Sequence, residues 1–134
     1  MSISLEQADV ILAAARDKAD EIGVPMNIAV VDAGANLTAF ARQDGAWLGS
    51  IAVAQDKAFT ARAFDSPTGD LYDMTQPGGA LYGIGVSNDG RVITFPGGVP
   101  ISRGDEIVGA IGVSGGTPDQ DQDVAEAGAA AYTD

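Results

Sequence analysis

Hydrophobic and polar positions follow a helical period at the start of the chain. Between residues 5 and 22 the apolar residues recur at steps of three and four, which is typical of an amphipathic helix. Ser4 precedes this stretch and Gln7 follows three residues later, the spacing of a capping box. Gly23 comes directly after the last periodic residue, so we expect the helix to end there.

The pattern then changes to short extended runs and returns to a helix. Two strands are predicted over residues 26–31 and 37–42, joined as a hairpin by the turn-forming residues 32–36. Residues 48–63 have a helical pattern built mainly from alanine, and a short helix is predicted within residues 65–74.

The second half of the chain predicts three more strands and a final helix. After a loop over residues 75–90, strands are expected at 91–95, 99–102 and 107–114. A helix is expected from 117 to 131, because Thr117 and Gln120 have the spacing of a second capping box. Because tight turns join neighbouring strands, the strands must run antiparallel. The fold class is therefore α+β, a five-stranded, mostly antiparallel sheet flanked by helices.

Glycines interrupt the last predicted strand at Gly109 and Gly112, and the strand is followed by Gly115 and Gly116. Glycine weakens a strand, so it usually marks the close approach of another backbone or of a ligand. We therefore expect a cavity walled by backbone where this strand faces the amine of Lys57 on the central helix.

Length and composition favour one soluble domain over residues 1–134, of which 46% are hydrophobic. No apolar run approaches the roughly 20 residues of a membrane helix, and the N-terminal residues lack the basic and apolar parts of a signal peptide. A cytoplasmic location is expected.

The chain contains no cysteine and no histidine. Disulfides, thiolate metal sites and Ser-His-Asp triads are excluded, so acid–base chemistry would use Asp, Glu, Lys, Tyr or Arg. The spacing of Asp119, Asp121 and Asp123 resembles part of a calcium loop, but the remaining ligands and the central glycine are absent. We predict no metal site.

Acidic residues outnumber basic residues by 19 to 7, giving a net charge of −12. Such a surface repels nucleic acids and anionic membranes, so neither is expected as a partner. The charge is typical of a solubilising or salt-adapted surface, and a cationic ligand is the alternative.

Three motifs in order, within residues 31–46, 54–61 and 95–121, resemble those of the GlcG/HbpS family, also called the haem-degrading domain family. The family is similar to the C-terminal domain of PduO proteins. The resemblance implies a profilin-like α-β-α sandwich that assembles into dimers or larger homo-oligomers. It also implies haem as a candidate ligand, since some relatives bind haem, whereas PduO-type relatives are linked to corrinoid metabolism. Many members have no established activity.

Some haem binders of the family hold the iron with a histidine ligand, and this chain has no histidine. We expect no required cofactor. If haem binds, its iron would need one of the remaining candidate ligands, which are Lys57, Tyr72, Tyr82, Tyr132, Met26 and Met74.

Lys57 and Asp121 are the candidate catalytic residues. A desolvated lysine can act as a base or as a Schiff-base amine, and the second family motif centres on Lys57. The alternative is that Lys57 pairs with a nearby carboxylate. Asp121 is the best candidate carboxylate, either as a general base or as the partner of Lys57.

The candidate ligand-binding residues include two arginines and an aspartate. Arg42 could hold a ligand carboxylate in a bidentate fork, or it could pair with Asp44 and fix a turn. Arg103 is either an anion clamp or a turn residue.

Backbone and hydroxyl groups of the third motif complete the candidate ligand-binding set. Gly97 and Gly98, followed by Pro100, could present N–H groups to an oxyanion, or simply connect two strands. Ser114 is also assigned to the ligand-binding set.

Three functional hypotheses follow from these residues. The first is a homo-oligomeric protein that binds a small planar or carboxylated molecule, such as a tetrapyrrole, between protomers. The second is a cofactor-independent isomerase, hydratase or lyase in which Lys57 and Asp121 move protons. The third is a structural or regulatory oligomer without a ligand.

Overall fold

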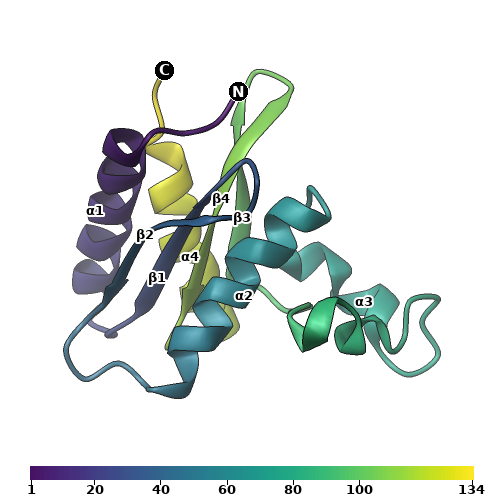
Figure 1. The fold of residues 1–134 in the computed structure, drawn as a ribbon. Coiled ribbons are helices and arrows are strands. Elements are labelled where there is room, and N and C mark those ends of the chain that lie inside the picture. The colour runs from purple at the N-terminus through teal and green to yellow at the C-terminus, as the bar shows by residue number, and fades with distance from the viewer.

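The computed structural model describes residues 1–134 and has a four-stranded sheet between two helical layers (Figure 1). The main helices are α1 (Leu5–Ile22), α2 (Gly49–Ala63) and α4 (Pro118–Ala130). The strands are β1 (Asn27–Asp32), β2 (Leu37–Arg42), β3 (Gly98–Arg103) and β4 (Glu106–Ser114). Four short helical elements lie between α2 and β3: η1 (Thr68–Leu71), α3 (Tyr72–Thr75), η2 (Ile84–Val86) and η3 (Asn88–Gly90).

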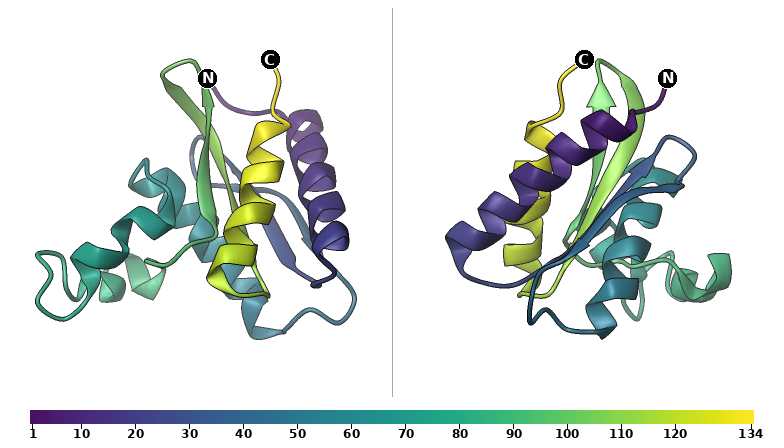
Figure 2. Two further views of the ribbon diagram at one scale, coloured as in Figure 1. Left: turned by 180° about the vertical axis from the view of Figure 1, so that it is seen from behind. Right: turned by 60° about the vertical axis from the view of Figure 1, so that its left-hand side comes forward.

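The sheet has the strand order β2-β1-β4-β3, and every neighbouring pair is antiparallel. Helices α1 and α4 cover one face, and α2 covers the other (Figure 2). Residues 64–97, here called the lateral segment, leave the end of α2 and project to one side of the sheet (Figure 1). The α+β class and the antiparallel arrangement are confirmed.

The predicted fifth strand, residues 91–95, is wrong. This stretch has no strand partner and instead runs along α2. The buried hydroxyl of Thr60 accepts from the N–H of Ile93, and its single proton is shared between the carbonyls of Asp56 at 2.7 Å and Arg91 at 3.1 Å. A side chain on a helix therefore satisfies backbone groups that a neighbouring strand would otherwise satisfy.

Both predicted capping boxes are confirmed. The Ser4 hydroxyl accepts from the N–H of Gln7, whose side chain accepts from the N–H of Ser4. Thr117 and Gln120 form the same reciprocal pair at the start of α4. These pairs fix where α1 and α4 begin, because they satisfy N–H groups that have no partner within the helix.

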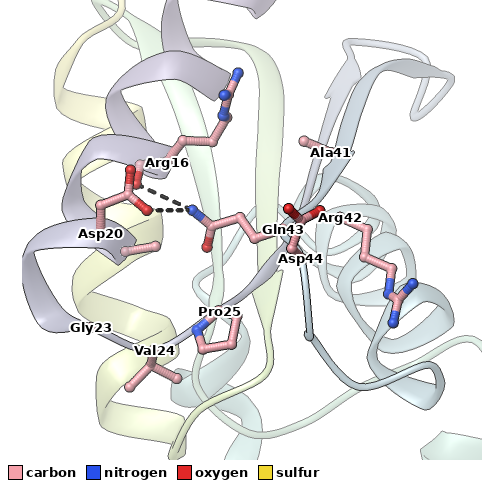
Figure 3. Close-up of a pocket in the computed structure, with 10 residues that line it drawn as sticks. Arg16, Asp20, Gly23, Val24, Pro25, Ala41, Arg42, Gln43 and Asp44 are labelled. Carbon is pink, nitrogen blue, oxygen red and sulfur yellow. Dashed lines mark hydrogen bonds between the residues drawn. The ribbon is translucent and has the colours of Figure 1, made fainter.

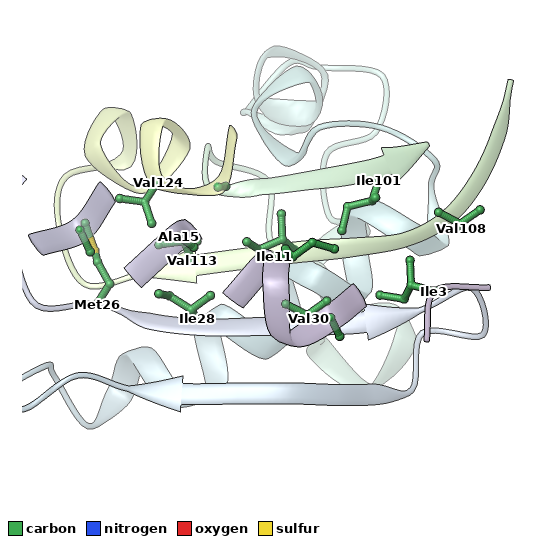
Figure 4. Close-up of a cluster of buried hydrophobic side chains, with 14 residues drawn as sticks. Ile3, Ile11, Ala15, Met26, Ile28, Val30, Ile101, Val108, Val113 and Val124 are labelled. Atoms are coloured by element: carbon green, nitrogen blue, oxygen red, sulfur yellow. The ribbon is translucent and has the colours of Figure 1, made fainter. Parts of the chain in front are cut away.

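The two faces of the sheet have different cores. The side that faces α1 and α4 buries fourteen residues, mostly large aliphatic side chains such as Ile11, Ile28 and Ile111 (Figure 4). The side that faces α2 buries six residues, of which five are alanine and one is Val31. Because these side chains are small, α2 lies close to the sheet.

Gly112 of β4 makes this close approach possible. A Cβ on Gly112 would overlap the carbonyl oxygen of Ala54 and the backbone nitrogen of Ala58 in α2, whereas one on Gly109 would meet the carbonyl oxygen of Val31 in the neighbouring strand β1 at 2.5 Å. Backbone atoms therefore approach both glycines. This agrees with one of the two predicted alternatives, a neighbouring backbone rather than a ligand. The expected cavity at this place is wrong, since α2 fills the space.

None of the helices combines the length and the apolar character that crossing a bilayer requires.

Candidate functional site

Lys57 is the largest completely buried side chain of the protein. Its position on α2 directs the amine toward the end of β4. The Nζ atom donates to the Val113 carbonyl at 2.8 Å and to Asp121 Oδ2 at 2.9 Å, and it lies 4.9 Å from the centroid of the Phe95 ring. Two hydrogen bonds and a cation–π contact thus surround the ammonium group.

Asp121, in the first turn of α4, forms an ion pair with Lys57. Its Oδ1 accepts from the N–H of Gly116 at 2.9 Å, and its side chain is almost completely buried. A carboxylate in the first turn also opposes the positive end of the helix dipole. The ion pair with Lys57 therefore joins α2 to α4 across the end of β4.

Burial disfavours the charged forms of both Lys57 and Asp121. It lowers the pKa of the Lys57 amine, and the charge and hydrogen bond of Asp121 oppose that shift. It raises the pKa of the Asp121 carboxyl, while Lys57 and the N–H groups of Gly116 and Gly115 pull that pKa down. Such shifts are found at catalytic sites and also at buried structural pairs.

Gly97 and Gly98 cover this pair, and their N–H groups are already engaged. Gly97 donates to Gln122 Oε1 at 3.0 Å and Gly98 donates to Thr68 Oγ1 at 2.9 Å. A Cβ on Gly97 would lie 2.5 Å from Lys57 Nζ. The two glycines connect the lateral segment to β3, and in this arrangement they offer no free N–H group to an anion.

The structure does not bring Arg42 and Asp44 together with Lys57. Arg42 donates from Nε and Nη2 to the Ala46 carbonyl, at 3.1 and 2.7 Å, and so fixes the turn after β2. The predicted alternative of an Arg42–Asp44 ion pair is wrong, because no such pair forms. Both residues line a polar surface groove of about 730 Å³ with Arg16 and Asp20 (Figure 3).

The remaining candidate ligand residues are spread over the sheet. Arg103 lies at the β3–β4 turn, where its Nε is 3.2 Å from Asp134 Oδ1, and Pro100 lies in the middle of β3. Ser114 ends β4, and its buried hydroxyl bonds to that of Ser50 at 3.1 Å. These residues do not form one site with Lys57, and their ligand-binding roles stay predictions.

Accessibility separates the six candidate iron ligands. Met26 and Lys57 are completely buried, and Tyr132 packs against the large core. Tyr72, Met74 and Tyr82 are 47%, 43% and 66% exposed. All three exposed candidates lie within eleven residues of each other on the lateral segment.

The lateral segment also exposes other large apolar side chains, and the residue pattern did not predict this surface. Leu81, Val86 and Phe95 are exposed on it together with the two tyrosines and Met74. The available signal was the presence of large apolar residues in a stretch that is rich in glycine and otherwise typical of a loop.

Comparisons with known proteins identify the family. The family described as haem degrading protein HbpS-like matches residues 3–130. An uncharacterized 15.0 kDa protein of Citrobacter freundii is 39% identical over 125 residues, covering 93% of this chain and 88% of the relative. Corrinoid adenosyltransferase PduO of the same organism is 40% identical over 131 residues, which are 98% of this chain but only 39% of PduO.

A solved structure described as a PduOC:heme complex has the same fold. It superposes with a TM-score of 0.95 at 36% identity, covering 99% of this chain and 96% of the other. The chain therefore belongs to the GlcG/HbpS family of HbpS-like haem degrading proteins, as its three motifs indicated.

Proposed function

We propose that this protein binds haem, or a closely similar tetrapyrrole, on the lateral segment. The observation that carries the proposal is that Tyr72, Met74 and Tyr82, the most exposed of the six possible iron ligands, all lie on the lateral segment beside other exposed apolar residues. The likeness to a chain solved as a haem complex, over 99% of the present chain, supports the same ligand class.

The chemistry of the lateral segment suits a tetrapyrrole. A phenolate or a thioether can ligate haem iron, and a porphyrin face packs favourably on exposed aliphatic and aromatic side chains. Arg91, which lies 4.0 Å over the ring of Phe59 and pairs through Nε with Asp56 at 3.3 Å, is partly exposed and keeps its terminal nitrogens for a propionate. In a chain of net charge −12, such a cation is needed close to an anionic ligand.

The ligand would lie between protomers. Ligand pockets usually bury 70–90% of a small molecule, but a projecting segment covers only one face of a planar ring. A second protomer would supply the cover for the other face. This placement retains the sequence-based prediction of a pocket at a subunit interface.

Haem titration followed by the Soret band tests the proposal. We expect a shift that saturates at a fixed haem-to-protein ratio. Of Tyr72→Phe, Met74→Leu and Tyr82→Phe, the variant that removes the true ligand should change the spectrum and weaken binding by about tenfold or more, equivalent to about 1.4 kcal/mol. Tyr132→Phe is the matched control and should bind like the wild type. Absence of any stoichiometric shift would remove the tetrapyrrole proposal.

A second candidate function is proton-transfer catalysis by Lys57 and Asp121. The observation that favours it is a buried amine–carboxylate pair in which burial shifts both pKa values toward the neutral forms. A substrate would reach the amine only if Phe95 and Gly97 moved away from it.

Selective amine modification distinguishes a reachable Lys57 from a closed one. The chain has two lysines, so Lys18, which is partly exposed, is an internal control. During brief acetylation read by peptide mass spectrometry, a closed pair predicts label on Lys18 and none on Lys57. Comparable labelling of both lysines would favour the catalytic function over the structural one.

A further inference from the structure

The two edges of the sheet differ in whether their outward backbone groups are free. Strands β2 and β3 are the edge strands of the order β2-β1-β4-β3. An edge strand presents unpaired N–H and C=O groups that can pair with another chain, unless proline, side chains or another element blocks them. The hydrogen-bond pattern shows which residues present these groups.

The outer edge of β3 is blocked. Val113 donates to the Gly97 carbonyl at 2.8 Å, so alternation along the ladder turns the backbone groups of Gly98 and Pro100 away from β4. The outward N–H of Gly98 is already bonded to Thr68, and Pro100 has no N–H. Two outward donors of β3 are therefore unavailable to a further strand.

The outer edge of β2 is open. Gln43 donates to the Met26 carbonyl at 3.0 Å, so alternation places the pairs 28–41 and 30–39 in hydrogen-bonded positions toward β1. The N–H and C=O groups of Phe40 and Arg42 consequently point outward, where the sheet has no further strand. Strand β2 contains no proline and no acidic residue.

We propose that β2 pairs antiparallel with β2 of a second copy of this chain about a two-fold axis. The pairing is self-complementary, because the outward donors and acceptors of one copy meet the same groups of the other. The two four-stranded sheets would then form one continuous sheet. This interface goes beyond the proposed haem function, since it uses the opposite edge of the sheet from the lateral segment.

Exposed apolar side chains at the two ends of β2 support a second copy as the occupant. Leu37 is exposed at the start of the strand, and Trp47 and Leu48 are exposed just after its end. Two-fold antiparallel pairing brings the start of one β2 beside the end of the other, so apolar residues approach apolar residues. In a chain of net charge −12, the absence of acidic residues from β2 also limits repulsion between copies there.

A matched pair of variants at Arg42 tests the pairing by sedimentation over a concentration series. Arg42→Ala and Arg42→Pro lose the same side chain, but only Arg42→Pro also loses the outward N–H. By symmetry the proline variant removes two hydrogen bonds from the dimer, so its dimer dissociation constant should be about 10- to 100-fold weaker than that of Arg42→Ala. Equal dissociation constants, or a wild type that stays monomeric throughout, would overturn the proposal.

Single-cysteine crosslinking tests the same interface without proline, and the absence of native cysteine makes the readout clean. Phe40→Cys, Ala41→Cys and Arg42→Cys are oxidised separately, with Ser102→Cys on β3 as the control. The β2 position nearest the two-fold axis should form a covalent dimer, because a disulfide needs Cα atoms about 4.4–6.8 Å apart. Crosslinking of Ser102→Cys alone, or of none of the four, contradicts pairing through β2.

Discussion

Replacing Lys57 by methionine is expected to lower the free energy of unfolding by about 3–5 kcal/mol, the usual cost of removing one partner from a buried ion pair. Methionine fills a similar volume, so the loss comes mainly from charge and hydrogen bonding. The Asp121 carboxylate and the Val113 carbonyl would lose the ammonium that now satisfies them. Urea unfolding at neutral pH measures the change, and a loss below about 1 kcal/mol would show that the pair is not structural.

The double variant Lys57→Met/Asp121→Asn separates the contribution of the ion pair to the free energy of unfolding from that of side-chain packing. Asparagine keeps the shape of the aspartate and an oxygen that can accept from the N–H of Gly116, but it leaves no uncompensated charge. The double variant should therefore be more stable than Lys57→Met alone. A double variant whose loss equals the sum of the two single losses would mean that the two side chains do not interact.

The destabilisation by Lys57→Met should also depend on pH. Without its cation, the buried Asp121 carboxyl has a folded-state pKa raised further above its unfolded value. Between those two pKa values the folded state binds more protons than the unfolded state, so stability falls as pH rises. Lys57→Met should thus lie closer to the wild type near pH 5 than near pH 7.5, as followed by urea midpoints. A pH-independent difference contradicts this, and adding Asp121→Asn should abolish the dependence.

Gly112→Ala is the second substitution for which we expect a large effect. The new methyl group would overlap backbone atoms of Ala54 and Ala58, which a helix cannot move individually, so α2 must shift away from β4. Overpacking usually costs 1–3 kcal/mol, and contact with backbone places this case at about 3 kcal/mol or more.

Thermal or urea unfolding of Gly112→Ala measures that cost, with Gly49→Ala as its control. Gly49 lies in the first turn of the same helix, and a Cβ there would meet nothing within 4 Å. The control should be neutral or slightly stabilising, since alanine is the better helix former. If Gly112→Ala were as stable as Gly49→Ala, the close packing of α2 on β4 would be wrong.

Local signals predicted the parts of the fold that local interactions determine. Both capping boxes lie within four consecutive residues, so the sequence contains everything needed to place the starts of α1 and α4. The stretch 91–95 failed because the group that replaces its strand partner is the Thr60 hydroxyl, about thirty residues earlier in the chain. The apolar residues of this stretch fit a strand pattern, but the side chain that competes with a strand partner has no local signature.

The candidate site could be predicted only in part for a similar reason. A glycine in β4 signals a close approach, yet nothing in the sequence states whether a helix or a ligand approaches, and at Gly112 it is α2. The contact of Lys57 with Asp121 agrees with one of the predicted alternatives. The exposure of Tyr72, Met74 and Tyr82 depends on how the lateral segment projects from the sheet, which the sequence does not encode locally.

Haem titration of the triple variant Tyr72→Phe/Met74→Leu/Tyr82→Phe tests the central claim most directly. These substitutions remove every candidate ligand on the lateral segment while keeping the ring and aliphatic volumes of its exposed surface. The account predicts a stoichiometric Soret shift for the wild type and for Tyr132→Phe, and its loss in the triple variant with the fold intact by circular dichroism. A triple variant that binds haem with the wild-type spectrum and affinity would contradict binding on the lateral segment.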